Sequence, residues 1–192
     1  MLERFRSKFP VTDEKWQTYV SYFTRLNVPA RTTLLAEGEI STKAYLIEKG
    51  AIRVCFNHHG KDITSQFFFE NQTVSSIESL KKSIPIRVSV ETIEPSILWR
   101  IEKRNLERVL EEMNEIREIR NFITDALLER TFHYMDHFLS FIRDTPEERY
   151  LKLLQDAPHI IIRVPQHYIA SYLGISGVHL SRIKSKIAKK KQ

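Results

Sequence analysis

The side chains best suited to chemistry gather near the C-terminus, where lysine and arginine stand without acidic partners. The formal net charge of the 192-residue chain is +6, and the whole excess falls after Ile175. The basic residues of this stretch are Arg182, Lys184, Lys186, Lys189, Lys190 and Lys191. A neutral body with a basic end is typical of proteins that meet a polyanion, usually nucleic acid and less often an acidic membrane surface. On charge alone, a lysine tail that only aids solubility remains the alternative.

The segment from Val164 to Ile183 has the pattern of two short helices joined by a tight turn. Ala170 is small where the two helices would cross, and Gly174 provides the backbone freedom that the turn requires. Ser176 can cap the second helix. The apolar residues that would pack between the helices are Ile169, Leu173, Ile175, Leu180 and Ile183. This combination, with Pro165 at the start, predicts a helix-turn-helix.

The second of these helices has one face suited to reading DNA. At about 100° per residue, Leu180, Ile183 and Ile187 point inward and the opposite face points outward. In a major groove, Arg182 can contact a guanine or a phosphate, and Val178 can touch a thymine methyl group. The lysines would meet phosphates and set the salt dependence. The predicted DNA-binding residues are Gln166, Ser176, Gly177, Val178, Ser181, Arg182, Lys184, Ser185, Lys186 and Lys189.

The middle of the chain, from Thr32 to Ile101, has the pattern of short strands. Apolar or alternating runs cover residues 32–36, 44–48, 51–56, 63–69, 87–93 and 97–101, and Gly38, Gly50 and Gly60 lie in the turns between them. Strands this short, without connecting helices between most of them, favour an antiparallel sandwich or roll over a parallel sheet. Residues 13–26 are predicted to form a helix that lies against it.

After Ile101 the pattern becomes helical, with a short helix over residues 102–113 and a long one over 114–143. Thirty residues of helix would reach about 45 Å. The apolar side chains of the long helix form a band too wide for one face. One side of the helix can cover the β domain, and the rest of the band needs another partner. A second copy of the same helix, in a two-fold dimer, is the simplest partner, and burial within one subunit is the alternative.

A new helix begins at Thr145, where the sequence has the signature of a capping box. Thr145 is the cap, Pro146 takes the first helical position, and Glu148 can return a hydrogen bond. Residues 160–164 are then expected to form a short strand. The predicted domains are 1–113, a β-roll sensor domain with flanking helices; 114–143, a dimerisation helix; and 144–192, the helix-turn-helix domain.

Several classes of protein are excluded or disfavoured by the residues present. Cys55 is the only cysteine, which excludes an internal disulfide, a zinc site of cysteine pairs and a cysteine-held iron-sulfur cluster. No apolar run approaches the roughly 20 residues that cross a bilayer, and the N-terminus does not resemble a signal peptide. The sequence contains no catalytic nucleophile paired with a general base and no phosphate-binding loop. We therefore expect a cytoplasmic protein that is not an enzyme and holds no metal.

The segments Leu35–Glu39 and Tyr45–Val54, the long helix and the helix-turn-helix together resemble the Crp/Fnr family of bacterial transcription regulators. The resemblance covers roughly Val28 to Lys189. It implies an α+β fold with an antiparallel β-roll of the cyclic-nucleotide-binding type, a long dimerisation helix and a C-terminal helix-turn-helix domain. It also implies a homodimer that reads a two-fold symmetric site in double-stranded DNA, with RNA polymerase as a further candidate partner.

The family pattern is broken where an effector would bind. Family members that bind cyclic nucleotides resemble one another in two motifs: a Gly-Glu pair that holds the ribose, and an Arg-Ser or Arg-Thr pair that holds the cyclic phosphate. Residues 70–78 lack the first pair, although Arg87 could hold an anion. We therefore identify no cofactor and do not expect a cyclic nucleotide, and we predict an effector pocket of Ser75, Ser76, Arg87 and Ser89. The alternative function is a small-anion-sensing module whose basic C-terminus docks an acidic protein or a membrane.

Overall fold

The structure, a computed structural model, describes residues 2–190, with side chains throughout except at four positions near the two ends. The chain divides into two compact units. Met1–Arg53 and Phe68–Arg130 form the first, called here the β-roll unit. Val54–Phe67 and Thr131–Gln192 form the second, called here the helical unit. The units are defined by contacts within one chain, so the division into 1–113, 114–143 and 144–192 stays a prediction.

The fold contains two four-stranded sheets, most of which lie in the β-roll unit, while residues 54–67 of β4 and β5 belong to the helical unit. The strand pairings of β1 with β8, β2 with β7, β3 with β6 and β3 with β8 are antiparallel. One sheet has the order β1-β8-β3-β6, with β1 at Phe23–Val28, β8 at Ser96–Glu102, β3 at Lys43–Lys49 and β6 at Thr73–Val74. The other has the order β2-β7-β4-β5, with β2 at Thr33–Leu35, β7 at Ser89–Thr92, β4 at Ile52–His58 and β5 at Lys61–Phe68. Ile47, Ile52 and Leu98 are fully buried in it. The predicted antiparallel β-roll is confirmed.

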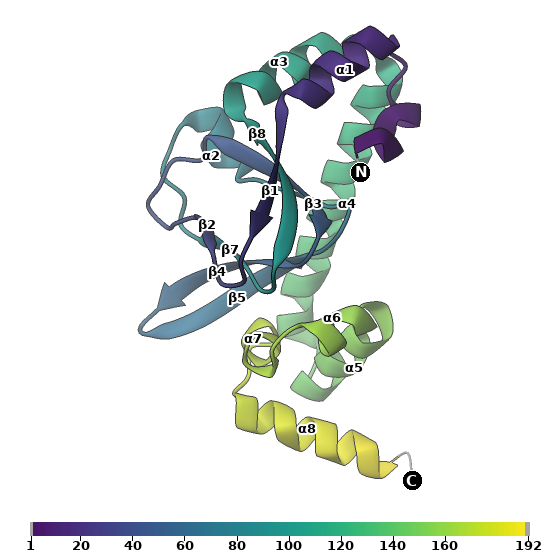
Figure 1. Cartoon of the computed structure of the whole chain (residues 1–192). Helices are drawn as coiled ribbons and strands as arrows, with labels where there is room; N and C mark the ends of the chain where they lie inside the picture. Colours follow the sequence, from purple (N-terminus) through teal and green to yellow (C-terminus); the bar gives the residue numbers. More distant parts are fainter. Residues whose placement is uncertain (1, 191–192) are drawn as a thin grey trace. The chain divides into compact units, whose positions relative to one another are not determined.

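Helices cover the ends of the sheets in this unit. A 3₁₀ helix (Leu2–Lys8) precedes α1 (Asp13–Ser21), and α3 (Lys103–Met113) directly follows β8. In Figure 1, α1 and α3 lie side by side near the ends of β1 and β8, and the hydroxyl of Tyr19 donates to Glu112 across them, at 3.0 Å. Tyr19 and Met113 share an apolar cluster with Ile119. The short helix α2 (Ile77–Lys82), absent from the sequence prediction, begins at the cap Ser76.

The predicted helix over residues 13–26 is wrong in its second half. Helix α1 ends at Ser21, and β1 begins at Phe23 and pairs with β8 from Phe23 opposite Ile101 to Val28 opposite Ser96. A free edge of β8 needs hydrogen-bond partners, and this requirement outweighs the local helical pattern. The helix–strand boundary therefore depends on a segment more than 70 residues away in the sequence.

The long helix α4 runs over Arg117–Arg143 and passes from one unit into the other between Arg130 and Thr131. Its predicted start at residue 114 is three residues early. The predicted capping box at its far end is confirmed: Thr145 accepts from the backbone of Glu148, and the Glu148 carboxylate accepts from the backbone of Thr145. Helix α5 (Pro146–Asp156) begins there.

The predicted strand at residues 160–164 is wrong, because residues 160–163 belong to helix α6 (Pro158–Arg163) and Val164 is its C-cap. Pro158 at the first helical position favours a helix start, and Ile160 is buried while Ile162 is exposed. Three consecutive isoleucines carry no periodicity that separates a strand from a helix. Helices α7 (Gln166–Tyr172) and α8 (Gly177–Lys190) follow, and the predicted helix-turn-helix is confirmed.

Candidate nucleic-acid interface and effector pocket

The two helices of the helix-turn-helix are joined by a glycine that the turn requires for two reasons. Gly174 has φ +68, a conformation that side chains rarely adopt. A Cβ at this position would also lie 2.7 Å from the Phe141 ring of α4. Ile169, Leu173 and Leu180 are almost completely buried around the turn, as predicted. The orientation of α8 relative to α7 is thus fixed by packing.

A polar side chain forms a hydrogen bond with a backbone N–H at the start of α8, and another does so with a backbone carbonyl at the end of α7. Ser176 accepts a hydrogen bond from the backbone N–H of His179, at 3.2 Å, which confirms it as the cap of α8. Arg149 of α5 donates to the carbonyl of Leu173 from Nε (3.2 Å) and Nη2 (3.0 Å). Its Nη1 donates to the carbonyl of Asp144 at 2.7 Å, and its guanidinium lies 4.7 Å from the Phe141 ring centre. Arg149, which the sequence prediction did not include, therefore joins the end of α7 to the junction of α4 and α5.

The predicted DNA-binding residues lie mostly on one exposed surface. Ser176, Gly177, Val178, Ser181, Arg182, Ser185, Lys186 and Lys189 are all exposed, Val178 to 64%. Leu180, Ile183 and Ile187 are buried on the opposite face of α8, as the helical period predicts. The structure therefore presents most of the predicted set together, on the side of α8 that faces solvent in this chain.

Two of the predicted lysines have partners within the chain. Lys184 is half-buried, and its ammonium donates to Oε1 of Gln166 at 3.0 Å, which brings these two predicted residues together. Lys186 forms an ion pair with Glu147 of α5 at 2.5 Å. Arg182 has no ion pair or side-chain hydrogen bond among residues 2–190. The guanidinium of Arg182 is thus available to an external anion without breaking an internal contact.

His179 is a candidate contact that the sequence prediction missed. It is exposed in the first turn of α8, three residues before Arg182, so the two side chains share one face. The same helical period that selected Arg182 could have selected it. Its imidazole can donate to a base edge or to a phosphate.

Helix α4 has a second apolar face that is exposed in the part of the chain that the structure describes. Tyr134 and Phe141 lie on the face that contacts the helical unit, through Gln66 and Arg149 respectively. Rotation by about 100° per residue places Met135 and Ile142 on another face, together with Leu128 and Leu139. The exposed fractions are 54% for Met135 and 72% for Ile142. A surface of this kind is typical of an interface.

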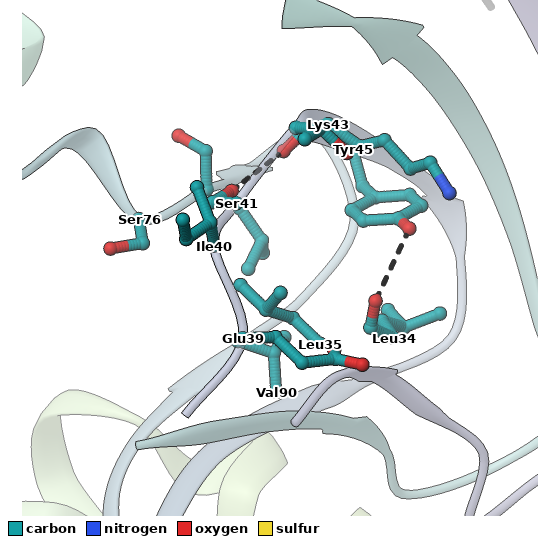
Figure 2. Close-up of a pocket in the computed structure, with 12 residues that line it drawn as sticks. Leu34, Leu35, Glu39, Ile40, Ser41, Lys43, Tyr45, Ser76 and Val90 are labelled. Atoms are coloured by element: carbon teal, nitrogen blue, oxygen red, sulfur yellow. Dashed lines mark hydrogen bonds between the residues drawn. The ribbon is translucent and has the colours of Figure 1, made fainter. Parts of the chain in front are cut away.

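The β-roll unit contains a pocket with a cavity volume of about 420 Å³. Figure 2 shows its lining, which combines apolar side chains of β2 and β7 with polar groups from the loop before β3. The residues that line it are Leu34, Leu35, Glu39, Ile40, Ser41, Thr42, Lys43, Tyr45, Val74, Ser75, Ser76 and Val90. A cavity of this size is in the range of small-molecule sites. We call it the β-roll pocket.

The predicted effector residues are divided by the structure. Ser75 and Ser76 line the β-roll pocket, whereas Arg87 and Ser89 are not among its lining residues. Arg87 is exposed, and the hydroxyl of Ser89 accepts from the backbone N–H of Glu37 at 3.0 Å. Lys43 is the positively charged residue among those that line the pocket. The sequence prediction did not include it because it lies in β3, far along the chain from residues 75–89.

Much of the hydrogen-bonding capacity of the pocket is used by the chain itself. Glu39 accepts from the backbone N–H of Ala36 at 2.8 Å, and the Tyr45 hydroxyl donates to the carbonyl of Leu34 (Figure 2). Burial raises the pKa of Tyr45, so its hydroxyl stays protonated. Ser76 caps α2 by accepting from the backbone of Ser79. Lys43 and Ser75 have no side-chain partner among the described residues.

The lining of the β-roll pocket differs from the pattern that the family resemblance implies for cyclic nucleotides. No arginine lines the pocket to hold the phosphate. The two acids of residues 70–78 are engaged elsewhere: Glu70 accepts from the backbone N–H of Gly50 at 2.9 Å, and Glu78 pairs with Lys82 at 2.9 Å. The hydrogen bond from Lys82 lowers the pKa of Glu78. The lining of the pocket therefore contains neither the arginine nor the Gly-Glu pair of the pattern that the resemblance implies.

The β-roll is similar to a known domain family. Residues 25–113 match the family of cyclic nucleotide-binding domains. No curated protein matches the chain in sequence.

Solved structures extend the likeness over nearly the whole chain. CLP of Xanthomonas campestris, described as a c-di-GMP-responsive global regulator, has a TM-score of 0.75 at 15% identity, covering 94% of this chain and 93% of that one. FixK2 of Bradyrhizobium japonicum has a TM-score of 0.74 at 19% identity, covering 88% and 86%. A protein assigned to the Crp/Fnr family from Eubacterium rectale has a TM-score of 0.71 at 16% identity, covering 96% and 88%. The chain has the Crp/Fnr fold.

This result confirms the resemblance and the fold class expected from the sequence. The chain places a β-roll before a long helix and a helix-turn-helix, which is the order that the resemblance implied. Among residues 2–190, no helix is long and apolar enough to cross a membrane, and no group of three or more His, Cys, Asp or Glu side chains could hold a metal ion.

Proposed function

We propose that the protein is a dimeric, DNA-binding transcription regulator of the Crp/Fnr type that reads a two-fold symmetric operator through α8. The observation that carries this proposal is the exposed polar and basic face of α8, held in place by the buried side chains of Leu180, Ile183 and Ile187. A helix of this kind is the usual reading element of a helix-turn-helix. The likeness to other regulators supports it at the level of the fold.

The contacts on α8 divide into base-reading and phosphate-binding groups. Arg182 is exposed and free of internal ion pairs among the described residues, so its fork of donors can contact a guanine or a phosphate. Lys186 and Lys189 provide charge for the phosphate backbone, and the ion pair with Glu147 has to yield when Lys186 binds a phosphate. We infer that Arg182 sets sequence choice and the lysines set affinity.

The dimer in this proposal is formed through the exposed apolar face of α4. Leu128, Met135 and Ile142 are spaced by seven residues, the repeat of a coiled-coil seam. Leaving these side chains in water is unfavourable, at about 25 cal/mol per Å² of apolar surface. A second copy presents the same face, and two-fold symmetry allows the two to pack together. The dimer would also supply the two recognition helices, about 34 Å apart, that successive major grooves require.

The effector site of this proposal is the β-roll pocket. Thr42, Lys43 and Ser75 line the pocket and have no side-chain partner among the described residues, so a small organic anion with an apolar part is the ligand class that we expect. We expect cyclic AMP to leave the melting temperature of the protein unchanged. Thermal shift measurements with cyclic AMP, and with a set of small carboxylates and phosphate esters, test this. A ligand of the pocket should lose its effect in Lys43→Ala and keep it in Arg87→Ala.

The decisive experiment selects bound duplexes from a random library and then measures affinity for the enriched site by fluorescence anisotropy at several salt concentrations. We expect a palindromic site, steep salt dependence, and binding about tenfold weaker or more in Arg182→Ala. Arg104→Ala is the matched control, because Arg104 is an exposed arginine of α3 with no side-chain partner among the described residues, and it should bind as the wild type does.

Two outcomes would contradict the proposal. One is equal binding of every duplex in the library by the wild type, and the other is unchanged affinity in Arg182→Ala. If the protein selected no DNA but bound vesicles that contain phosphatidylserine, the docking-module alternative would replace the regulator.

A further inference from the structure

Helix α7 is held by two elements of the helical unit that lie outside the helix-turn-helix. One is the hairpin of β4 and β5, of which residues 54–67 belong to this unit, and the other is α4. The contacts to the hairpin join residues more than 100 positions apart in the sequence.

The hydroxyl of Ser171 makes two hydrogen bonds to the backbone of β5. It accepts from the N–H of Thr64 at 2.8 Å and donates to the carbonyl of Asp62 at 2.9 Å. Strand β5 is last in its sheet, so the backbone groups along its outer edge have no strand partner. The N–H of one residue and the carbonyl two residues earlier point to the same edge. Ser171 therefore satisfies two edge groups with a single side chain.

Buried side chains surround this contact. Thr64 and Gln66 are almost completely buried although both are polar. Gln66 accepts a hydrogen bond from the Tyr134 hydroxyl of α4. Phe67 lies with its ring centre 5.1 Å from that of Tyr172, which in turn stacks on His137 of α4 at 4.1 Å. The hairpin thus contacts both α7 and α4, and α7 also contacts α4.

The root of the same hairpin lies in the β-roll unit and is joined there to the pocket wall. Arg53 of β4 is buried, and its Nε forms an ion pair with Glu91 of β7 at 2.7 Å. Val90, the neighbour of Glu91 in β7, lines the β-roll pocket. A change at the pocket wall can therefore reach the hairpin through two adjacent residues of β7 and one buried ion pair.

We propose that Ser171 is a positioning residue that latches the helix-turn-helix to the edge of β5, so that the position of the hairpin sets the orientation of α8. The inference rests on the proposed function, because the consequence of the latch is measured through DNA binding. With the latch closed, α7 has one orientation, and each α8 of a dimer can be held at the separation that the operator requires. With the latch open, that orientation is no longer fixed. Specific binding then weakens, while contacts to phosphate alone remain.

The latch is tested first without DNA, by hydrogen exchange of the full chain. In Ser171→Ala, the amides of residues 61–67 should exchange faster, because the N–H of Thr64 loses its acceptor. Ser171→Thr keeps the hydroxyl and should restore slow exchange. Ser21→Ala is the matched control, since the Ser21 hydroxyl donates only to a carbonyl of its own helix. The β8 peptide 96–102 reports global unfolding and should stay unchanged in all variants.

The second arm measures binding to the selected operator and to a scrambled duplex. Ser171→Ala should bind the operator about tenfold more weakly, the size expected for two lost hydrogen bonds, and the scrambled duplex equally well. Ser171→Thr and Ser21→Ala should match the wild type. The salt dependence of scrambled binding should be the same in all four proteins.

The outcomes separate the latch from the proposed function. Unchanged exchange at residues 61–67 in Ser171→Ala overturns the latch, whatever the DNA result. Faster exchange with unchanged or tighter operator binding overturns the positioning role and leaves the regulator standing. If the wild type selects no operator, the proposed function fails, and the exchange arm alone still accepts or rejects the contact between Ser171 and β5.

Discussion

Helix α8 and the β-roll pocket use their polar side chains in opposite ways. On α8, Arg182 and Lys189 are exposed and have no ion pair within the described chain. In the pocket, Glu39, Tyr45 and Ser76 already bond to the backbone of their own unit. The helix is therefore complementary to an external polyanion as it stands, while the pocket offers little charge to a ligand.

This difference indicates that the two ends of the molecule are under different physical constraints. A DNA-reading helix needs free donors on one face and a buried opposite face, and α8 meets both conditions at Arg182 and Lys189, whereas Lys184 and Lys186 have partners within the chain. A ligand pocket can differ in shape and in its few polar groups while the sheets around it stay the same. The β-roll thus keeps the fold of the cyclic nucleotide-binding domain family, while its pocket is lined by a different set of polar residues.

The largest expected effect comes from a substitution that disrupts the proposed dimer and leaves the β-roll pocket unchanged. In Ile142→Glu, a charge enters the exposed apolar face of α4, and we expect a monomer in analytical ultracentrifugation. Specific DNA binding should fall by about a hundredfold or more, because each monomer can contact one half-site only.

The control for that variant is Ile162→Glu, which makes the same change at an exposed isoleucine of α6. It should stay dimeric and bind DNA normally. A dimeric Ile142→Glu protein would show that α4 is not the interface.

The second effect concerns the turn that fixes α8. Gly174→Ala should lower the free energy of unfolding by about 3 kcal/mol, because the new Cβ meets both an unfavourable φ and the Phe141 ring. Gly60→Ala, with φ +77 and no atom within 4 Å of the new Cβ, should cost about 1 kcal/mol. Urea unfolding measures both values. Equal costs would mean that the packing against Phe141 adds nothing.

The third effect is a pH dependence in the support of α7. Burial, with lesser contributions from His133 and Arg149, lowers the pKa of His137 to about 4, against a small opposing effect of Asp136. The unfolded chain, with the ordinary pKa of 6.5, binds the proton more tightly. Stability is therefore full above pH 6.5 and is lost as the pH falls towards 4.

Between pH 7 and pH 5, we expect His137 to account for a loss of about 1 kcal/mol, a figure reduced for its partial exposure. The groups that face it are His133 and Asp136 on α4, Arg149 and Lys152 on α5, and the Tyr172 ring. In His137→Phe, which keeps a ring against Tyr172, this part of the pH dependence should vanish in urea unfolding. An identical pH profile in the variant would assign the loss to another group.

The smallest effect sharpens the electrostatic side of the comparison. Glu147→Gln removes the partner of Lys186, so affinity for DNA should rise about twofold to threefold, with a slightly steeper salt dependence. Glu111→Gln, which removes an exposed acid of α3, is the control and should change affinity less. Equal increases in DNA affinity in the two variants would show that the effect comes from net charge alone.

Local patterns allowed much of the helical unit to be predicted from the sequence. The capping box at Thr145, the turn at Gly174 and the buried face of α8 follow from interactions between residues a few positions apart. The prediction for residues 160–164 was wrong because three isoleucines fit either period, whereas Pro158 at the start and the burial of Ile160 favour the helix.

The effector pocket was harder to predict because its residues come from distant segments. Ser75 and Ser76 were found from one segment of the family pattern, but Lys43 lies in β3, and Arg87 proves to be exposed. Sequence order does not reveal which loops the sheets bring together.

The sequence by itself determined the β-roll class, the helix-turn-helix and the basic recognition face, because strand alternation, helical period and turn chemistry act over short distances. Only the tertiary structure decided where α1 gives way to β1, which polar groups meet in the pocket, and that Ser171 bonds to the edge of β5. Each of these depends on backbone groups that must find a partner, and the nearest partner in space lies far away along the chain.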